Sequence, residues 1–191
     1  MARYELKWID KDAEVGPIFQ IGDHDIYHRE RPGQRVVRLD AISSPNLDYL
    51  EPAVEAFREL AIHWNSPIIF VINPDVKNPP AARFLYEWSQ AAHQNGSVDQ
   101  SFMLMTNVFT HVLGRLVCRG FCSAGMPFDA IAGRPALDAA IDELNTATNW
   151  PDWAIVEEST ALVVRKGVGE GAYGQLFTRL FNRLRGKGET T

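Results

Sequence analysis

The chain has 191 residues, of which 46% are hydrophobic and 23% charged, and its formal net charge is −5. These values are ordinary for one globular domain, and they argue against global disorder and against a general nucleic-acid binder, which would need a basic face. No apolar run reaches the roughly 20 residues of a membrane-spanning helix, and the N-terminus lacks the apolar core of a secretory signal. Because Cys118 and Cys122 are poorly spaced for a disulfide on one helix, we expect a cytoplasmic protein.

The first part of the chain has the composition of β-strands. Strands are predicted where β-branched and aromatic residues gather, over residues 5–9, 18–27 and 35–42, with turns at Gly22-Asp23 and at residues 31–34. The pattern changes at Ser44-Pro45, which predicts a helix N-cap followed by proline at the first helical position. Apolar residues at helical spacing then extend to Trp64, although Pro52 allows a later start.

Strand and helix patterns alternate after this helix. The apolar run at residues 67–72 is typical of a central strand covered on both faces. The predicted units that follow are a helix over 79–94, a strand over 101–105, a helix over 108–122, a strand over 127–132 and a helix over 135–144. This alternation predicts an α/β fold, with a mixed sheet of four to six strands flanked by helices.

The C-terminal part has a different pattern. Residues 161–164 read as an edge strand, and the glycines between 167 and 171 read as a hinge, which divides the chain into a domain of residues 1–166 and a tail of residues 167–191. The tail predicts a basic amphipathic helix with the interface residues Tyr173, Phe177, Leu180, Phe181 and Leu184. Such a helix packs on its own domain, forms a dimer interface, docks on an acidic partner or lies peripherally on an anionic membrane.

The order of these elements between about residues 20 and 145 resembles a STAS domain, the SpoIIAA-like fold of anti-sigma-factor antagonists. The segments Pro127-Phe128-Asp129-Ala130-Ile131 and Ala136-Leu137-Asp138-Ala139-Ala140-Ile141 are similar to the last strand and closing helix of that fold. In the family, a serine after the second core strand is phosphorylated by a partner kinase, and amides at a helix start stabilise the added phosphate. Here the matching stretch, residues 73–82, contains neither serine nor threonine, so the resemblance implies a family member without this switch.

The resemblance also implies where a protein partner binds. It points to the loop and helix start after the apolar strand, with Asn73, Asp75, Lys77, Asn78, Arg83 and Glu87 as the predicted partner-binding residues. The leading prediction is therefore a non-enzymatic protein-interaction or regulatory module. Its partner is either another protein or a second copy of this chain. The alternative is a carrier or sensor of a small apolar or nucleotide-like ligand, and a cryptic enzyme ranks third.

Residue types that could carry chemistry are present but isolated. His24 and His28 lack the third ligand that a metal site needs, and Cys118 and Cys122 are better read as small core residues. His111 shares a helix with them, but nothing resembling a nucleophile elbow or an oxyanion hole surrounds it. We therefore predict no catalytic residue, metal or cofactor. A ligand carrier would need a deep pocket, whose expected lining is Phe70, Phe84, Trp88, Met103 and Phe109, whereas an interaction module would pack these side chains tightly and expose an apolar patch instead.

Overall fold

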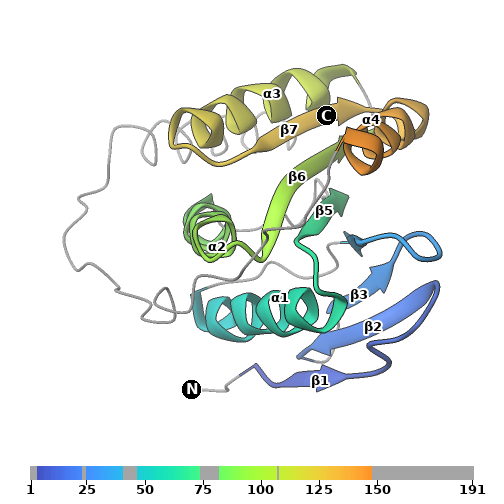
Figure 1. The fold of residues 1–191 in the computed structure, drawn as a ribbon. Coiled ribbons are helices and arrows are strands. Elements are labelled where there is room, and N and C mark those ends of the chain that lie inside the picture. Colours follow the sequence, from blue (N-terminus) through green and yellow to red (C-terminus); the bar gives the residue numbers. More distant parts are fainter. Residues whose placement is uncertain (1–3, 23–24, 41–46, 74–81, 107, 148–191) are drawn as a thin grey trace, which may run out of the picture. The chain divides into compact units, whose positions relative to one another are not determined.

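The computed structural model describes residues 4–22, 25–40, 47–73, 82–106 and 108–147, which form a mixed sheet flanked by helices (Figure 1). The strands are β1 (Leu6–Trp8), β2 (Gly16–Ile21), β3 (Asp25–Arg29), β4 (Val36–Asp40), β5 (Ile68–Asn73), β6 (Val98–Met105) and β7 (Phe128–Ala132). The helices are the short 3-10 helix η1 (Leu47–Tyr49), α1 (Leu50–Trp64), α2 (Ala82–Gln94), α3 (Val108–Ser123) and α4 (Arg134–Ala147). The predicted α/β class is confirmed, but the predicted four to six strands are too few, because all seven strands join one sheet.

The strands lie side by side in the order in which they occur in the chain. Strands β1 to β4 form an antiparallel meander, and β4 to β7 run parallel, with Val37 opposite Phe70 and Met103 opposite Ala130. Every crossover between parallel strands therefore moves in the same direction across the sheet. Because such crossover connections are right-handed, α1, α2 and α3 all lie on the same face of the sheet.

The two faces of the sheet are covered by different helices. On the first face, the ring of Phe70 packs against Phe57 of α1 and Trp88 of α2, with centroid distances of 4.8 and 4.7 Å. On the second face, α4 covers a buried cluster consisting of Val36, Ile69, Val71, Phe102, Ile131, Leu137 and Ile141. Alternate residues of β5 thus point into two different cores, which explains why its sequence is continuously apolar.

Helix α1 begins later than Ser44-Pro45 predicts. Its first residue is Leu50, and its N-cap is Tyr49, which makes no side-chain capping hydrogen bond. Pro52 consequently lies in the first turn, where a missing N–H leaves no helical hydrogen bond unmade. The predicted N-cap at Ser44 is therefore wrong for this helix.

The turn predicted at residues 31–34 is confirmed, and a second turn of this kind follows α2. In the hairpin between β3 and β4, Gly33 has a φ of 65°, and the N–H of Gln34 donates to the carbonyl of Arg31. After α2, Gly96 has a φ of 77°, and the N–H of Ser97 donates to Oδ1 of Asn95 at 2.8 Å. Both glycines occupy the left-handed region that other residues rarely adopt.

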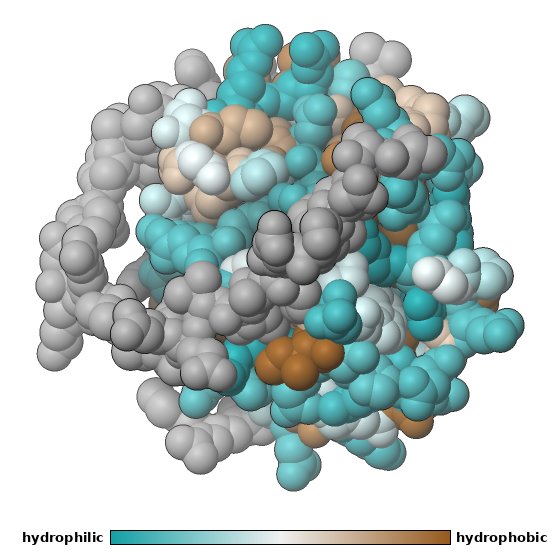
Figure 2. Space-filling view, viewed as in Figure 1, coloured by the Kyte–Doolittle hydropathy of each residue, from teal (hydrophilic) through white to brown (hydrophobic). Residues whose placement is uncertain are grey.

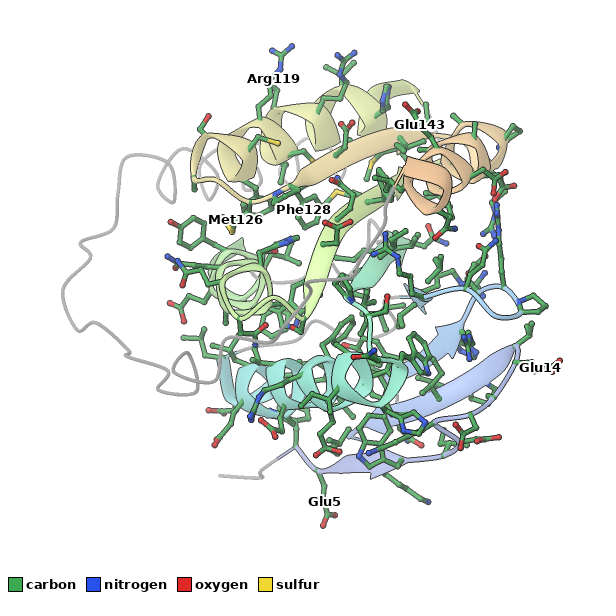
Figure 3. The ribbon with its side chains drawn as sticks, in the orientation of Figure 1. Glu5, Glu14, Arg119, Met126, Phe128 and Glu143 are labelled. Carbon is green, nitrogen blue, oxygen red and sulfur yellow. The ribbon has the colours of Figure 1, made fainter. Side chains whose placement is uncertain are left out.

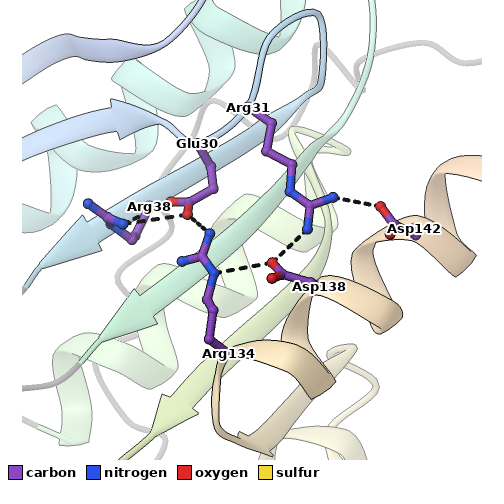
Figure 4. A network of polar contacts seen from close by, with 6 residues as sticks. All are labelled: Glu30, Arg31, Arg38, Arg134, Asp138 and Asp142. Atoms are coloured by element: carbon purple, nitrogen blue, oxygen red, sulfur yellow. Dashed lines mark hydrogen bonds and ion pairs between the residues drawn. The ribbon is translucent and has the colours of Figure 1, made fainter.

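Helix α4 is also held to the β3–β4 hairpin by charged side chains (Figure 4). Arg31 donates through Nη2 to Asp138 and through Nη1 to Asp142, each at 2.6 Å. The carboxylate of Glu30, only 4% exposed, receives Arg38 and Arg134. These contacts fix α4 against the second face of the sheet. The helix is therefore held both by apolar packing and by ion pairs to the hairpin.

None of the helices within the described ranges is long and apolar enough to cross a lipid bilayer. The predicted edge strand at 161–164 and the predicted C-terminal helix, including Tyr173, Phe177, Leu180, Phe181 and Leu184, lie outside the described residues. The proposed division of the chain at residue 166 lies outside them as well.

Candidate functional site

Only part of the predicted partner-binding segment can be placed. Asn73 is the last residue of β5, and Glu87 is a partly exposed residue of α2. Asp75, Lys77 and Asn78 lie outside the described residues, and so does the side chain of Arg83. The structure therefore neither brings these six residues together nor separates them, and this site stays a prediction.

A different surface emerges on α3. Val112 and Leu116 are exposed by 57% and 54%, respectively, which is unusual for large apolar side chains one helical turn apart. Arg115 and Arg119 are exposed beside them, and α3 contains no acidic residue. In Figure 3, Arg119 extends away from the helix into solvent. We call Val112, Arg115, Leu116 and Arg119 the α3 face.

The opposite side of α3 explains why this face points outward. Gly114, Val117, Cys118 and Phe121 are buried toward the sheet. At Gly114 the helix lies so close to β6 and β7 that an added Cβ would be 3.0 Å from Sδ of Met105. With 3.6 residues per turn, this close contact directs residues 112, 116 and 119 away from the sheet.

Other apolar side chains on the surface are scattered. Figure 2 shows hydrophobic residues on the displayed side as small, separate patches in a mostly hydrophilic surface. Ile62 of α1, for example, is exposed by 55%, but it follows an acidic stretch that includes Glu55 and Glu59. The α3 face differs because its apolar pair is accompanied by cations alone within the helix.

His111 and Cys122 have a structural role at the edge of the sheet. Among the described residues, β7 is the last strand of the sheet, and the N–H of Ser101 in β6 donates to the carbonyl of Pro127. Backbone groups alternate in direction along a strand, so the carbonyls of Phe128 and Ala130 point away from β6. Cys122 Sγ donates to the carbonyl of Phe128, and Nε2 of His111 to that of Ala130, both at 3.1 Å.

The two cysteines therefore differ. Cys118 is 2% exposed, and burial raises the pKa of its thiol, as expected of a small core residue. Cys122 is exposed and belongs to the β7 edge, so the prediction that both cysteines are buried is wrong for Cys122. Both thiols are free.

Three other titratable side chains, those of Tyr27, Tyr49 and His93, lie in closed surroundings. The hydroxyls of Tyr27 and Tyr49 are 2.9 Å apart, and burial raises the pKa of both phenols far above the usual range. Nε2 of His93 lies 3.2 Å from Oγ of Ser101, but Ser101 is fully buried and cannot reach a substrate. Burial lowers the pKa of His93 to about 4. Within the described ranges, no three His, Cys, Asp or Glu side chains gather as metal ligands would.

The side chains expected to line a deep pocket are packed. Phe70, Phe84, Trp88 and Met103 are at most 6% exposed, and the rings of Phe70 and Trp88 pack against each other at a tilt of 54° within the first core. The side chain of Phe109 lies outside the described residues. Two hollows of about 410 and 390 Å³ lie elsewhere, at the end of the sheet where the parallel strands begin.

No protein-family model matches this chain, and neither a curated protein nor a solved structure is significantly similar to it. Its function is therefore argued from its own geometry.

The α3 face was not selected from the sequence, although a signal was present. Apolar residues in α3 occur on every side of the helix rather than in one stripe. Once Gly114, Val117 and Cys118 are assigned to the core, Val112 and Leu116 fall on the opposite side. That assignment needs the position of the helix on the sheet, which periodicity alone does not give.

Proposed function

We propose that this chain is a non-enzymatic, STAS-like interaction module whose α3 face binds a protein partner through an acidic surface with an apolar centre. The observation that carries the proposal is the pair of half-exposed side chains Val112 and Leu116 on the same side of α3 as Arg115 and Arg119. Apolar centres with arginine are typical of protein interfaces. A partner rather than a small ligand is favoured because the face lies on the convex side of a helix.

Energetics support a contribution from both kinds of side chain. Burying a Val or Leu side chain contributes about 1.5–3 kcal/mol, and complementary charge speeds association and selects the partner. The chain as a whole carries a net charge of −5, whereas α3 carries only cations. An acidic partner would thus be repelled by much of this molecule and attracted at α3, which gives the contact its orientation.

The resemblance to STAS domains supports the same class of function without naming a partner. Successive strand and helix units occur in the order expected from that resemblance, and the missing phosphoacceptor implies constitutive binding. Tyr86 of α2 is 40% exposed, and its ring centroid lies 6.2 Å from that of Phe121 on the buried side of α3, so α2 and α3 pack against each other there. Residues 73–83 stay a predicted second part of the interface.

The alternative, a carrier of a small apolar ligand in the first core, has less support. That reading requires open space beside Phe70 and Trp88, where the rings are in contact. The tight packing and the exposed apolar pair are the two features predicted for an interaction module.

The test is site-specific photo-crosslinking in the cells that produce the protein. A photoreactive phenylalanine is placed at Leu116 in one variant and at Ile62 in the matched control, because the two side chains are exposed by 54% and 55%. A protein captured at 116 and not at 62 is then purified, and its affinity is measured for the wild type and for Leu116→Glu, Arg119→Glu and Ile62→Glu. We expect the two α3 variants to bind at least about tenfold more weakly, which corresponds to 1.4 kcal/mol.

Two results would refute the proposal. Capture of the same protein at both positions would show that the contact is not specific to α3. Capture of a second copy of the chain would assign the face to self-association. A charge exchange completes the test, because an acidic residue of the partner changed to lysine should restore binding to Arg119→Glu and to no other variant.

A further inference from the structure

The larger hollow lies where the ends of the strand β3 and of the helices α1 and α4 meet. Arg29 is the last residue of β3, Trp64 is the last residue of α1, and Asn145 belongs to the end of α4. Gln34 and Arg35 come from the turn before β4. The hollow is open to solvent and has a volume of about 410 Å³, within the range of small-molecule sites, and none of its described lining residues carries a carboxylate.

Both guanidinium groups of the hollow donate to backbone carbonyls, and Arg35 also forms an ion pair with Asp99. Arg29 donates through Nε to the carbonyl of Gln34 at 2.9 Å and through Nη1 to that of Ala13 at 3.2 Å. Its guanidinium carbon lies 4.4 Å from the ring centroid of Trp64. Carbonyls orient an arginine without neutralising its charge, so Arg29 is positioned while its positive charge persists.

Arg35 is more deeply buried and has both a carbonyl acceptor and a carboxylate partner. It is 8% exposed, donates through Nη1 to the carbonyl of Pro67 at 2.9 Å, and reaches Asp99 only at 3.5 Å. Burial lowers the pKa of Arg29 and Arg35, against the opposing charges of Asp12 and Glu14 near Arg29 and of Asp99 near Arg35. The nearby acids thus compensate only part of the desolvation of these two cations.

Two residues that line the hollow, Gln34 and Asn145, each contain a buried polar atom without a hydrogen-bond partner in the described part of the chain. Oε1 of Gln34 and Nδ2 of Asn145 are buried and make no hydrogen bond within the described residues. Buried polar atoms are nearly always hydrogen-bonded, to protein, water or ligand. One acceptor and one donor are therefore available beside two oriented cations.

We infer that this hollow binds a small organic anion, whose carboxylate or phosphate group lies against Arg29 and Arg35 and whose polar substituents bond to Gln34 and Asn145. A planar carboxylate and a tetrahedral phosphate both present a pair of oxygen atoms that can accept hydrogen bonds from a guanidinium group. Trp64 supplies the apolar wall on which the body of the ligand packs. This site is separate from the α3 face, so the two assignments are tested independently.

The test follows the full-length protein by NMR while three probes are added: inorganic phosphate, malonate and 3-phosphoglycerate. The signals observed are the indole N–H of Trp64 and the Nε–H groups of Arg29 and Arg35, with sodium chloride of matched ionic strength as the reference. We expect a saturable shift of these three signals. The strongest of the three probes distinguishes a carboxylate site, a phosphate site and a site for a ligand that carries both.

Charge variants at the two unbonded amides sharpen the test. Asn145→Asp and Gln34→Glu each place a negative charge within the hollow, and we expect either change to weaken binding by about tenfold or more. The matched control is Gln94→Glu, which makes the same change in the second hollow at the same end of the sheet and should leave the affinity unchanged. Thermal unfolding confirms that each variant is folded.

Three results would overturn the inference. Shifts equal to those caused by sodium chloride would indicate ionic screening alone. Binding that survives both Asn145→Asp and Gln34→Glu would place the anion elsewhere. Absence of any shift with all three probes would mean that water satisfies the two amides.

Discussion

The imidazole of His111 lies with Nε2 3.1 Å from the carbonyl oxygen of Ala130, across the open edge of β7. Two neighbouring contacts act in the same way: Cys122 donates to the carbonyl of Phe128, and the side chain of Asp129 accepts the N–H of Ala130 at 2.8 Å. The three side chains thus bond to backbone groups that a further strand would need for pairing. Unpaired strand edges are templates for aggregation. A histidine that could be taken for a catalytic residue thus completes the edge of the sheet.

Removing this contact should destabilise the protein and expose the edge. We expect His111→Ala to lower the free energy of unfolding by about 1 kcal/mol, because the carbonyl of Ala130 loses its donor, and to increase aggregation during refolding. His111→Gln, which retains a side-chain N–H, is the control and should aggregate less. Urea unfolding and light scattering measure the two effects. Equal stability of His111→Ala and the wild type would show that water replaces the imidazole at no cost.

Gly114 and Gly120 offer a matched comparison within α3. An added Cβ at Gly120 meets nothing within 4 Å, so Gly120→Ala should stabilise the protein by about 0.5–1 kcal/mol through helix propensity. At Gly114 the same atom would lie 3.0 Å from Sδ of Met105 and 3.3 Å from Cβ of Ala130. We expect Gly114→Ala to be destabilising in urea unfolding, because the helix must move away from the sheet. Stabilisation by both changes would mean that α3 packs more loosely than described.

His93 should make stability depend on pH. Burial lowers its pKa from 6.5 to about 4, against a hydrogen bond with the backbone of Val98, so the unfolded chain binds the proton more readily. Its contribution is fully present above pH 6.5 and is lost as the pH falls from about 6.5 to about 4. As the pH falls through this window, we expect the wild type to lose about 1–3 kcal/mol of unfolding free energy relative to His93→Gln. Urea unfolding across the window measures it, and a constant difference would contradict the burial of the ring.

Asp138 should act in the same direction but in a more acidic pH range. Burial alone would raise its pKa, but the hydrogen bond from Arg31 and the charge of Arg134 outweigh it and lower the pKa below 3.8. Its stabilisation is therefore present at neutral pH and lost as the pH falls through the folded value. Because Asp138 is 39% exposed, we expect Asp138→Asn to cost only about 0.5–1 kcal/mol at neutral pH.

Asp142 is the control for this change, since it contacts the same Arg31 but is 63% exposed. We expect Asp142→Asn to cost less than Asp138→Asn in urea unfolding at neutral pH. The difference between Asp138→Asn and the wild type should diminish toward acid. A larger effect at Asp142 would show that Arg31 depends on the outer carboxylate instead.

The sequence was informative where one pattern has one structural solution. The apolar run before Asn73 predicts a strand covered on both faces, and β5 is one. The alternation that follows predicts α2, β6, α3, β7 and α4 in the correct order. It does not predict the start of α1, because Ser44-Pro45 carries the same capping signal whether or not the helix forms there.

The candidate sites were less accessible from the sequence because they depend on tertiary placement. Val112 and Leu116 look like core residues until Gly114 is seen against Met105. The anion hollow joins residues as distant as Arg29 and Asn145, and neither belongs to a motif. His111 and Cys122 have the residue types of an active site, and only the position of β7 at the end of the sheet reveals their role.

The bridges from Arg31 to α4 span 107 and 111 residues of sequence. A chain made from its N-terminus can assemble the meander and each successive strand and helix as it emerges, since neighbours in sequence are neighbours in the sheet. The second core is different, because Val36, Ile69 and Val71 have no cover until Leu137 and Ile141 arrive. A nascent chain that stops before α4 therefore exposes the apolar second face of its sheet. We expect chaperones to bind this face until α4 packs on it and Arg31 forms its ion pairs with Asp138 and Asp142.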